Sequence, residues 1–150
     1  MRLSRRSDYA LRALFTLAVR FGGGPVSIRE LAAKNDIPRK FLEQIMLDLK
    51  GQGWVKSIPG RIGGFELLVP PDKLTMGQVV RHFDGILAPI GCVSSSDYEP
   101  CSQEPFCRFR RVLLDIRNFT TQLMDKATLA GVLRGDPVRR EEVFGAGEGI

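Results

Sequence analysis

Apolar side chains recur every three or four residues along the first third of the chain, which is the spacing of amphipathic helices. The first such segment begins near Ser7, which we expect to cap it, and ends at Gly22. The second begins at Ser27, whose side chain would form a capping box with Glu30. The third has Pro38 in its first turn and ends at the segment GQG. The pattern therefore predicts three helices, with a tight turn between the second and the third.

After this region the pattern changes. Two short apolar runs, WVKSI and FELLV, flank the glycine-rich segment PGRIGG, as in a two-stranded hairpin. The segment TMGQVVRHFDG then predicts a short helix capped by Thr75. Helical spacing returns from residue 109 to residue 133, and its apolar seam is narrow enough to suit a partner helix as well as a core. The seam consists of Phe106, Phe109, Leu113, Ile116, Phe119 and Leu123.

A helix, a short helix, a tight turn, a third helix and a hairpin are the elements of a winged helix-turn-helix. We therefore expect a mainly α fold with a small β wing and a long C-terminal helix. The expected division is a DNA-binding head at residues 1–73 and a region at 74–133 that holds a helix, a cysteine loop and a dimerisation helix. A polar, glycine-rich and flexible tail is expected at 134–150.

The composition fits a soluble domain that contacts a polyanion. No segment of the 150 residues approaches the ~18–20 apolar residues of a membrane span. No signal-peptide core follows the basic N-terminus, so we expect a cytoplasmic protein with no membrane partner. The net charge of +5 is unevenly distributed, because residues 1–73 contain 13 Lys or Arg and 7 Asp or Glu, whereas residues 74–150 contain 9 and 10. A basic N-terminal half favours nucleic acid as the partner.

The third helix of such a fold places its first turns in the major groove of double-stranded DNA. Cations in the first turn would reach phosphates or a guanine edge, whereas a carboxylate and an amide one turn later could read cytosine and adenine. A hydroxyl at the start of the second helix could bind a phosphate, and an arginine at the hairpin tip could approach the minor groove. The alternative is that these groups only solvate or cap helices. The candidate DNA-contacting residues are Ser27, Arg39, Lys40, Glu43, Gln44 and Arg61.

All three cysteines, Cys92, Cys101 and Cys107, lie in one turn-rich segment. Thiolates are the soft ligands that iron–sulfur clusters and zinc prefer, and either site normally takes four ligands. Cys107 is expected at the start of the long helix, where the helix dipole and three nearby arginines favour thiolate. Zinc, a disulfide with one spare thiol, or three inert buried thiols are the alternatives. The sequence contains no CxxC, no nucleotide-binding glycine motif and no Cys–His pair at motif spacing, which argues against an enzyme.

Three segments resemble the Rrf2 family of bacterial transcription regulators, which includes IscR-like and NsrR-like iron–sulfur sensors. They are MRLSRRSDYALRAL, SIRELAAKNDIPRKFLEQIMLDLKGQGWVKSIPGRIGGFELL, and TMGQVVRHFDG just before the cysteine loop. A long helix and TLAGVL follow, so the resemblance covers residues 1 to about 133. One departure lies in the wing. The family often has an arginine directly before a Gly-Pro-Gly-Gly-Gly run, whereas this chain has Pro59 there and Arg61 two places on.

The resemblance implies a homodimer that binds a partly palindromic operator. It implies that the long C-terminal helix holds the two subunits together. The residues we expect in that interface are Phe109, Leu113, Ile116 and Phe119.

The resemblance also implies an iron–sulfur cluster, 4Fe–4S in preference to 2Fe–2S, bound by the three cysteines. IscR-like members have a histidine three residues after the last cysteine, where this chain has Arg110, which cannot ligate. NsrR-like members instead have an aspartate in the first helix that reaches the partner subunit's cluster, and Asp8 occupies that position. The sole histidine, His82, is expected to be a surface or packing residue. The implied function is a repressor switched by nitric oxide, redox state or iron supply. The alternative is a winged-helix module for protein contacts, with a structural zinc or a thiol or disulfide switch.

Overall fold

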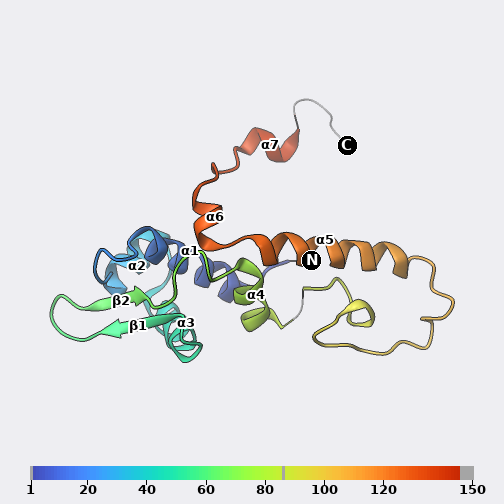
Figure 1. Cartoon of the computed structure of the whole chain (residues 1–150), viewed down its shortest axis with the longest axis horizontal. Coiled ribbons are helices and arrows are strands. Elements are labelled where there is room, and N and C mark those ends of the chain that lie inside the picture. Colours follow the sequence, from blue (N-terminus) through green and yellow to red (C-terminus); the bar gives the residue numbers. More distant parts are fainter. Residues whose placement is uncertain (1, 86, 146–150) are drawn as a thin grey trace.

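The structure is a computed structural model that describes residues 2–85 and 87–145 of the chain (Figure 1). Its described residues form a mainly helical fold with one antiparallel pair of strands, which confirms the predicted class. The elements are α1 (Arg5–Val19), α2 (Ile28–Asn35), α3 (Arg39–Gly51), β1 (Val55–Ile58), β2 (Gly64–Leu67), α4 (Met76–Asp84), the 3-10 helix η1 (Gly91–Val93), α5 (Arg110–Lys126), α6 (Leu129–Leu133) and α7 (Arg140–Phe144). A head made of α1–α3 and the two strands lies at one end, and α5 extends away from it toward the cysteine loop, residues 91–109 (Figure 1).

The core of the head is built from the apolar face of each of its three helices. Leu14, Leu31 and Leu42 are fully shielded from solvent, at positions where the helical spacing placed them. Burying a side chain of this size contributes about 1.5–3 kcal/mol. Phe41 is 41% exposed and meets the ring of Tyr9 edge-on at a centroid distance of 5.5 Å. The aromatic pair therefore closes the rim of the core between α1 and α3.

The wing is attached to the start of α2 by backbone hydrogen bonds. β1 and β2 pair antiparallel, with Val55 opposite Leu67. Val26, just before α2, donates from its N–H to the Phe65 carbonyl (2.9 Å) and accepts from the Phe65 N–H (2.8 Å). Val26 therefore pairs with the hairpin as a short third segment and joins the wing to the helix-turn-helix.

Two expected caps differ from the prediction. Helix α1 is capped by Ser4, whose hydroxyl oxygen accepts a hydrogen bond from the Ser7 N–H (3.1 Å), so the prediction of Ser7 as the cap was wrong. Ser7 is buried inside the first turn. Ser27 caps α2 as predicted by accepting from the Glu30 N–H (3.1 Å). The Glu30 carboxylate, however, accepts from Arg20 (2.9 Å) and forms an ion pair with it. Only one half of the predicted capping box is therefore present.

The helix predicted from residue 109 to residue 133 is divided into α5 and α6. The division follows from Thr128, which leaves the helix and caps α6 by accepting from a backbone N–H three residues on (3.0 Å). At the division the Ala127 carbonyl accepts from the Met76 N–H (2.9 Å), and the Leu129 N–H donates to the Leu74 carbonyl (2.9 Å). Backbone hydrogen bonds to Leu74 and Met76, at the start of α4, therefore replace the backbone hydrogen bonds of a continuous helix.

Helices α4 and α6 pack onto the head, whereas α5 stands apart from it. Leu74, Val79, Val80 and Leu129 belong to the same buried cluster as α1, so the boundary expected after residue 73 runs through this core. Arg81 of α4 donates two hydrogen bonds to Asp125 of α5 (2.6 and 2.8 Å). These bonds lower the pKa of Asp125 and fix the end of α5 against α4.

The C-terminal tail contains the short, exposed helix α7. The prediction of flexibility for its last part, residues 146–150, lies outside the described residues. Within the part of the chain that the structure covers, no helix has both the length and the apolar character needed to cross a membrane.

Candidate DNA-binding interface and cysteine site

The solvent side of α3 holds the residues predicted to read DNA. Arg39, Lys40, Glu43 and Gln44 are all exposed. Arg39 and Glu43 form an ion pair one turn apart, with Nε and Oε1 separated by 3.2 Å. Lys50, at the end of the helix, donates to the Ser57 hydroxyl of β1 (3.0 Å). The start of α3 is therefore open to a partner, whereas the basic group at its end is already bound to the wing.

The two remaining candidates lie on either side of the helix-turn-helix. The Ser27 hydroxyl oxygen is engaged as a cap, but its O–H can still donate to a phosphate oxygen. Arg61 lies exposed at the tip of the wing. The DNA contacts of both residues stay predictions.

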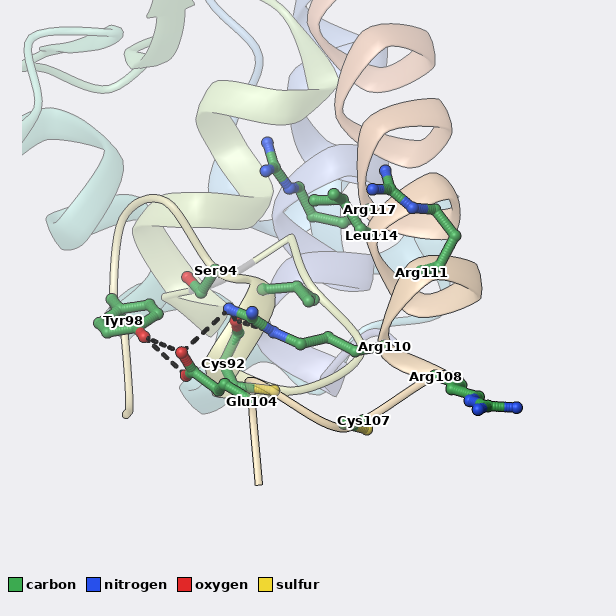
Figure 2. Close-up of a pocket in the computed structure, with 11 residues that line it drawn as sticks. Cys92, Ser94, Tyr98, Glu104, Cys107, Arg108, Arg110, Arg111, Leu114 and Arg117 are labelled. Atoms are coloured by element: carbon green, nitrogen blue, oxygen red, sulfur yellow. Dashed lines mark hydrogen bonds and ion pairs between the residues drawn. The ribbon is translucent and has the colours of Figure 1, made fainter. Parts of the chain in front are cut away.

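A cavity of about 470 Å³ lies between the cysteine loop and the first turns of α5 (Figure 2). Cys92 and Cys107 line this cavity. Cys101 is exposed and is not among the lining residues. The structure therefore brings two of the three predicted cysteines to one cavity and leaves the third on the outer part of the loop.

Arginines form the wall of the cavity that α5 contributes. Arg110 donates two hydrogen bonds to the Cys92 carbonyl (2.6 and 3.2 Å) and lies 3.4 Å from the Glu104 carboxylate. Arg108, Arg111 and Arg117 also line the cavity (Figure 2). The Nε of Arg117 is buried without a hydrogen-bond partner among the described residues. A wall of guanidinium groups favours an anionic occupant or thiolate ligands.

Glu104 organises the loop around the cavity. Its carboxylate accepts from the Tyr98 hydroxyl (2.6 and 2.7 Å) and from the Cys101 N–H (3.1 Å). The bond from Tyr98 is the main cause that lowers the pKa of Glu104, and the same bond raises the pKa of Tyr98. No pattern in the sequence indicated the pairing of Glu104 with Tyr98.

Cys107 precedes α5 instead of starting it. The helix begins at Arg110, three residues later, so the prediction that Cys107 lies at the start of the helix was wrong. A loop proline, Pro105, and the exposed Phe106 come just before it. The positive charge near Cys107 therefore comes mainly from the arginine side chains.

Asp8 is not among the residues that line the cavity. Its carboxylate accepts two hydrogen bonds from Arg12, from Nε (3.0 Å) and from Nη2 (2.7 Å). Arg12 also donates to the carbonyl of Asn35, the last residue of α2 (3.3 Å). Asp8 is therefore connected to the helix-turn-helix of its own chain.

His82 is not among the residues that line the cavity. Its ring meets Trp54 and Phe83 edge-on, at centroid distances of 5.6 and 4.7 Å. In the described residues, no three His, Cys, Asp or Glu side chains are placed so that together they could hold a metal ion.

Helix α5 presents an apolar seam to solvent. None of its 17 residues, all of which the structure describes, is buried. Leu113 is half-buried and packs against Ala88, Cys92 and Val93, so it contacts the cysteine loop. Val112, which sequence reasoning missed, is exposed on the seam. The exposed residues of the predicted seam are Phe106 (80%), Phe109 (69%), Ile116 (42%), Phe119 (68%) and Leu123 (60%), and Val112 is 59% exposed.

Comparison with known proteins identifies the family. Residues 3–135 match the Rrf2 family model, described as an iron-dependent transcriptional regulator. An rrf2-like HTH-type transcriptional regulator of Rhodobacter capsulatus is 37% identical over 92% of this chain and 97% of its own length. The chain belongs to the Rrf2 family of winged helix-turn-helix transcription regulators.

Two solved structures support the same assignment. CymR, the global cysteine regulator of B. subtilis, superposes with a TM-score of 0.73 at 30% identity, covering 91% of this chain and 99% of CymR. T. potens IscR superposes with a TM-score of 0.71 at 27% identity, covering 89% of this chain and 87% of IscR. The protein is therefore a DNA-binding transcription regulator and not an enzyme.

Proposed function

We propose that this regulator is a homodimeric repressor whose binding to a partly palindromic operator is switched by an iron–sulfur cluster, with 4Fe–4S favoured. The observation that carries the proposal is the arginine-walled cavity that Cys92 and Cys107 share. Soft thiol donors beside guanidinium groups fit an anionic, thiolate-bound cluster. Cys101 would supply the third thiolate once the outer loop turns inward.

The fourth ligand in this proposal is Asp8 of the partner subunit. The donor set of the described loop supports a ligand from elsewhere, because it contains three thiols where a cluster takes four ligands. Bound there, the cluster supplies iron that reacts with nitric oxide and oxidants and is lost when iron is scarce. A hard carboxylate among thiolates would be the most labile of the four ligands.

The hydrogen bonds of Asp8 support a route from the cysteine site to the DNA-reading helix. Arg12 holds Asp8 and the end of α2 with the same guanidinium group. If Asp8 turns to the partner's site, Arg12 loses a charged partner and its bond to Asn35 changes. The turn between α2 and α3 begins at the next residue, so this change would act on the orientation of α3.

The apolar seam of α5 supports the homodimer. Phe109, Ile116 and Phe119 are exposed, and their separations of seven and three residues are those of a heptad repeat. Such a strip is self-complementary, so a second copy of α5 covers it. Two heads on one dimer would then read the two halves of a partly palindromic operator.

A second candidate is a thiol or disulfide switch, or a structural zinc site, on the same regulator. The exposure of Cys101 favours this reading, because an accessible thiol can be oxidised. The absorption spectrum of the protein purified without oxygen separates these candidates. Iron–sulfur charge-transfer bands support the cluster, whereas a colourless protein with bound zinc or free thiols excludes it.

The role of Asp8 is tested with Asp8→Ala, reconstituted under anaerobic conditions beside the wild type. The fold should persist, because losing a favourable charge at a helix start costs only ~0.3–1 kcal/mol. We expect an altered circular dichroism spectrum and faster loss of iron to a chelator, whereas Cys92→Ala, Cys101→Ala and Cys107→Ala abolish the cluster. An unchanged spectrum and unchanged resistance to chelation would exclude Asp8 as a ligand.

A further inference from the structure

The tip of the wing is a tight turn that presents one cation and one aliphatic side chain. The Gly63 N–H donates to the Gly60 carbonyl (3.1 Å), so Arg61 and Ile62 occupy the two central positions of a β-turn. Gly60 has a φ of +110°, which L side chains rarely adopt, and a Cβ on Gly63 would overlap the carbonyl oxygen of Ile58. The two flanking positions therefore exclude side chains, and only Arg61 and Ile62 project from the tip.

Ile62 is 92% exposed, more than any other large apolar residue among those that the structure describes. A single exposed apolar residue is common on protein surfaces and means little by itself. Here, however, it lies beside an arginine on a tip that contains no acidic residue between Lys56 and Gly64. The nearest carboxylate, Glu66, is paired with Lys56 (3.2 Å). The tip is thus narrow, cationic and apolar, which suits the floor of a DNA groove.

We propose that Ile62 is an apolar wedge that enters the minor groove of the operator and partly unstacks one base step. The proposal rests on the DNA-binding function and deepens it. Minor-groove proteins combine an arginine that follows the groove with an aliphatic wedge that opens a step and bends the duplex. Pyrimidine–purine steps open most easily, so the wing would select a TpA or CpA step without a hydrogen bond to a base.

The attachment of the wing gives the wedge a rigid support. Val26 and Phe65 exchange two backbone hydrogen bonds (2.9 and 2.8 Å), which tie the hairpin to the start of α2. Lys50 ties the end of α3 to Ser57 of β1 (3.0 Å). Once α3 lies in the major groove, the wing tip has a fixed position relative to it. The wedge therefore acts at a fixed distance from the bases that α3 reads.

The test uses a duplex that the wild-type protein selects from a randomised library, with 2-aminopurine placed at successive positions outside the α3 contacts. Wild type should raise the fluorescence at one step and bend the duplex, measured by energy transfer between its labelled ends. Ile62→Ala should lose both signals and bind roughly tenfold more weakly, a change of about 1.4 kcal/mol. Replacing that pyrimidine–purine step by an A-tract should weaken wild type but not Ile62→Ala.

Two control variants separate the wedge from other causes. Val138→Ala shortens another strongly exposed aliphatic residue, in the tail, and should behave as wild type. Arg61→Ala should lower the salt dependence of binding, whereas Ile62→Ala should leave it unchanged. If Ile62→Ala raises the fluorescence and bends the duplex as much as wild type does, the wedge is overturned. Failure of wild type to select any duplex would overturn operator recognition itself.

Discussion

Arg12 is the residue through which Asp8 and the helix-turn-helix are connected. Its hydrogen bonds to Asp8 are short, but an exposed i,i+4 ion pair contributes only ~0.3–0.5 kcal/mol. The stability of the fold therefore depends little on this pair. Because Arg12 lies between a proposed ligand and the end of α2, we expect it to transmit a change at Asp8 to α2.

Arg12→Leu should uncouple operator binding from the cluster without removing the cluster. The leucine frees Asp8 and deletes the bond to the Asn35 carbonyl, so α2 no longer responds to what Asp8 binds. The measurement is the ratio of operator affinities with and without the cluster, which should approach one while the absorption spectrum keeps its cluster bands. Arg5→Leu, at another exposed arginine of α1, serves as the control. A wild-type ratio in Arg12→Leu would disprove the connection.

Glu43→Ala should change which sequence is preferred more than how tightly random DNA is bound. Glu43 is exposed one turn into α3 and is held by Arg39, so the carboxylate is oriented before DNA arrives. A base contact of this kind contributes ~1–3 kcal/mol of discrimination. Lys50→Ala is the matched control, because Lys50 is bound to Ser57 and should have no sequence-dependent effect. Equal losses on operator and random DNA for Glu43→Ala would show that Glu43 does not read bases.

At the scale of elements, the helices and the wing follow from local patterns, whereas the errors come from contacts that no local pattern contains. Apolar spacing predicted α1 to α4, because each buries one face against the same core. The cap of α1 was misplaced because Ser4 and Ser7 are both good caps, and only packing shows that Ser7 is inside the turn. The division between α5 and α6 depends on bonds to residues 74–76, which no local pattern contains.

The cysteine site, too, could be predicted only in part from the sequence. The sequence places the three cysteines in one segment, and in the structure Cys92 and Cys107 line one cavity. The arginine wall, the Tyr98–Glu104 bond and the contact of Leu113 with the loop arise from residues brought together by folding. Val112 was missed because Val112 and Leu113 both lie three or four residues from Phe109 and Ile116, so helical spacing alone does not choose between them.

The N-cap of α4 lies at the junction between the head and α5, so removing it tests what stabilises that junction. The Thr75 hydroxyl accepts from the Gln78 N–H (3.2 Å), and the Gln78 side chain accepts from the Thr75 N–H (3.0 Å). Thr75→Ala should cost about 1 kcal/mol, seen as a lower urea midpoint with an unchanged slope. Thr75→Ser keeps the hydroxyl and should restore most of the stability. If Thr75→Ala unfolds at the wild-type midpoint, backbone pairing with residues 127–129 holds this junction without the cap.

At the scale of the whole molecule, the seam of α5 decides the oligomeric state. Ile116→Asp should yield monomers, because the interface would bury an unpaired charge at a cost of several kcal/mol. Sedimentation velocity over a range of concentrations measures this. Asn118→Asp adds the same charge to the same helix at an exposed residue outside the seam, and should stay dimeric. A dimeric Ile116→Asp would place the subunit interface elsewhere.

The salt dependence of DNA binding connects the charge of the head with the dimer. Residues 1–73 carry the excess of basic side chains, and Arg39, Lys40 and Arg61 are exposed on the proposed DNA-binding face. If a dimer contacts ~6–10 phosphates, affinity falls roughly 10³- to 10⁵-fold between about 50 and 200 mM salt, because bound counterions are released.

The slope of log affinity against log salt should be about half as steep for Ile116→Asp, since a monomer has one head. Lys40→Ala should reduce the dimer's slope by about two, one phosphate for each subunit. The measurement is fluorescence anisotropy of a short labelled duplex over a salt series. A slope that is the same for dimer and monomer would mean that only one head of the dimer contacts DNA, and an affinity independent of salt would refute the electrostatic role of the head.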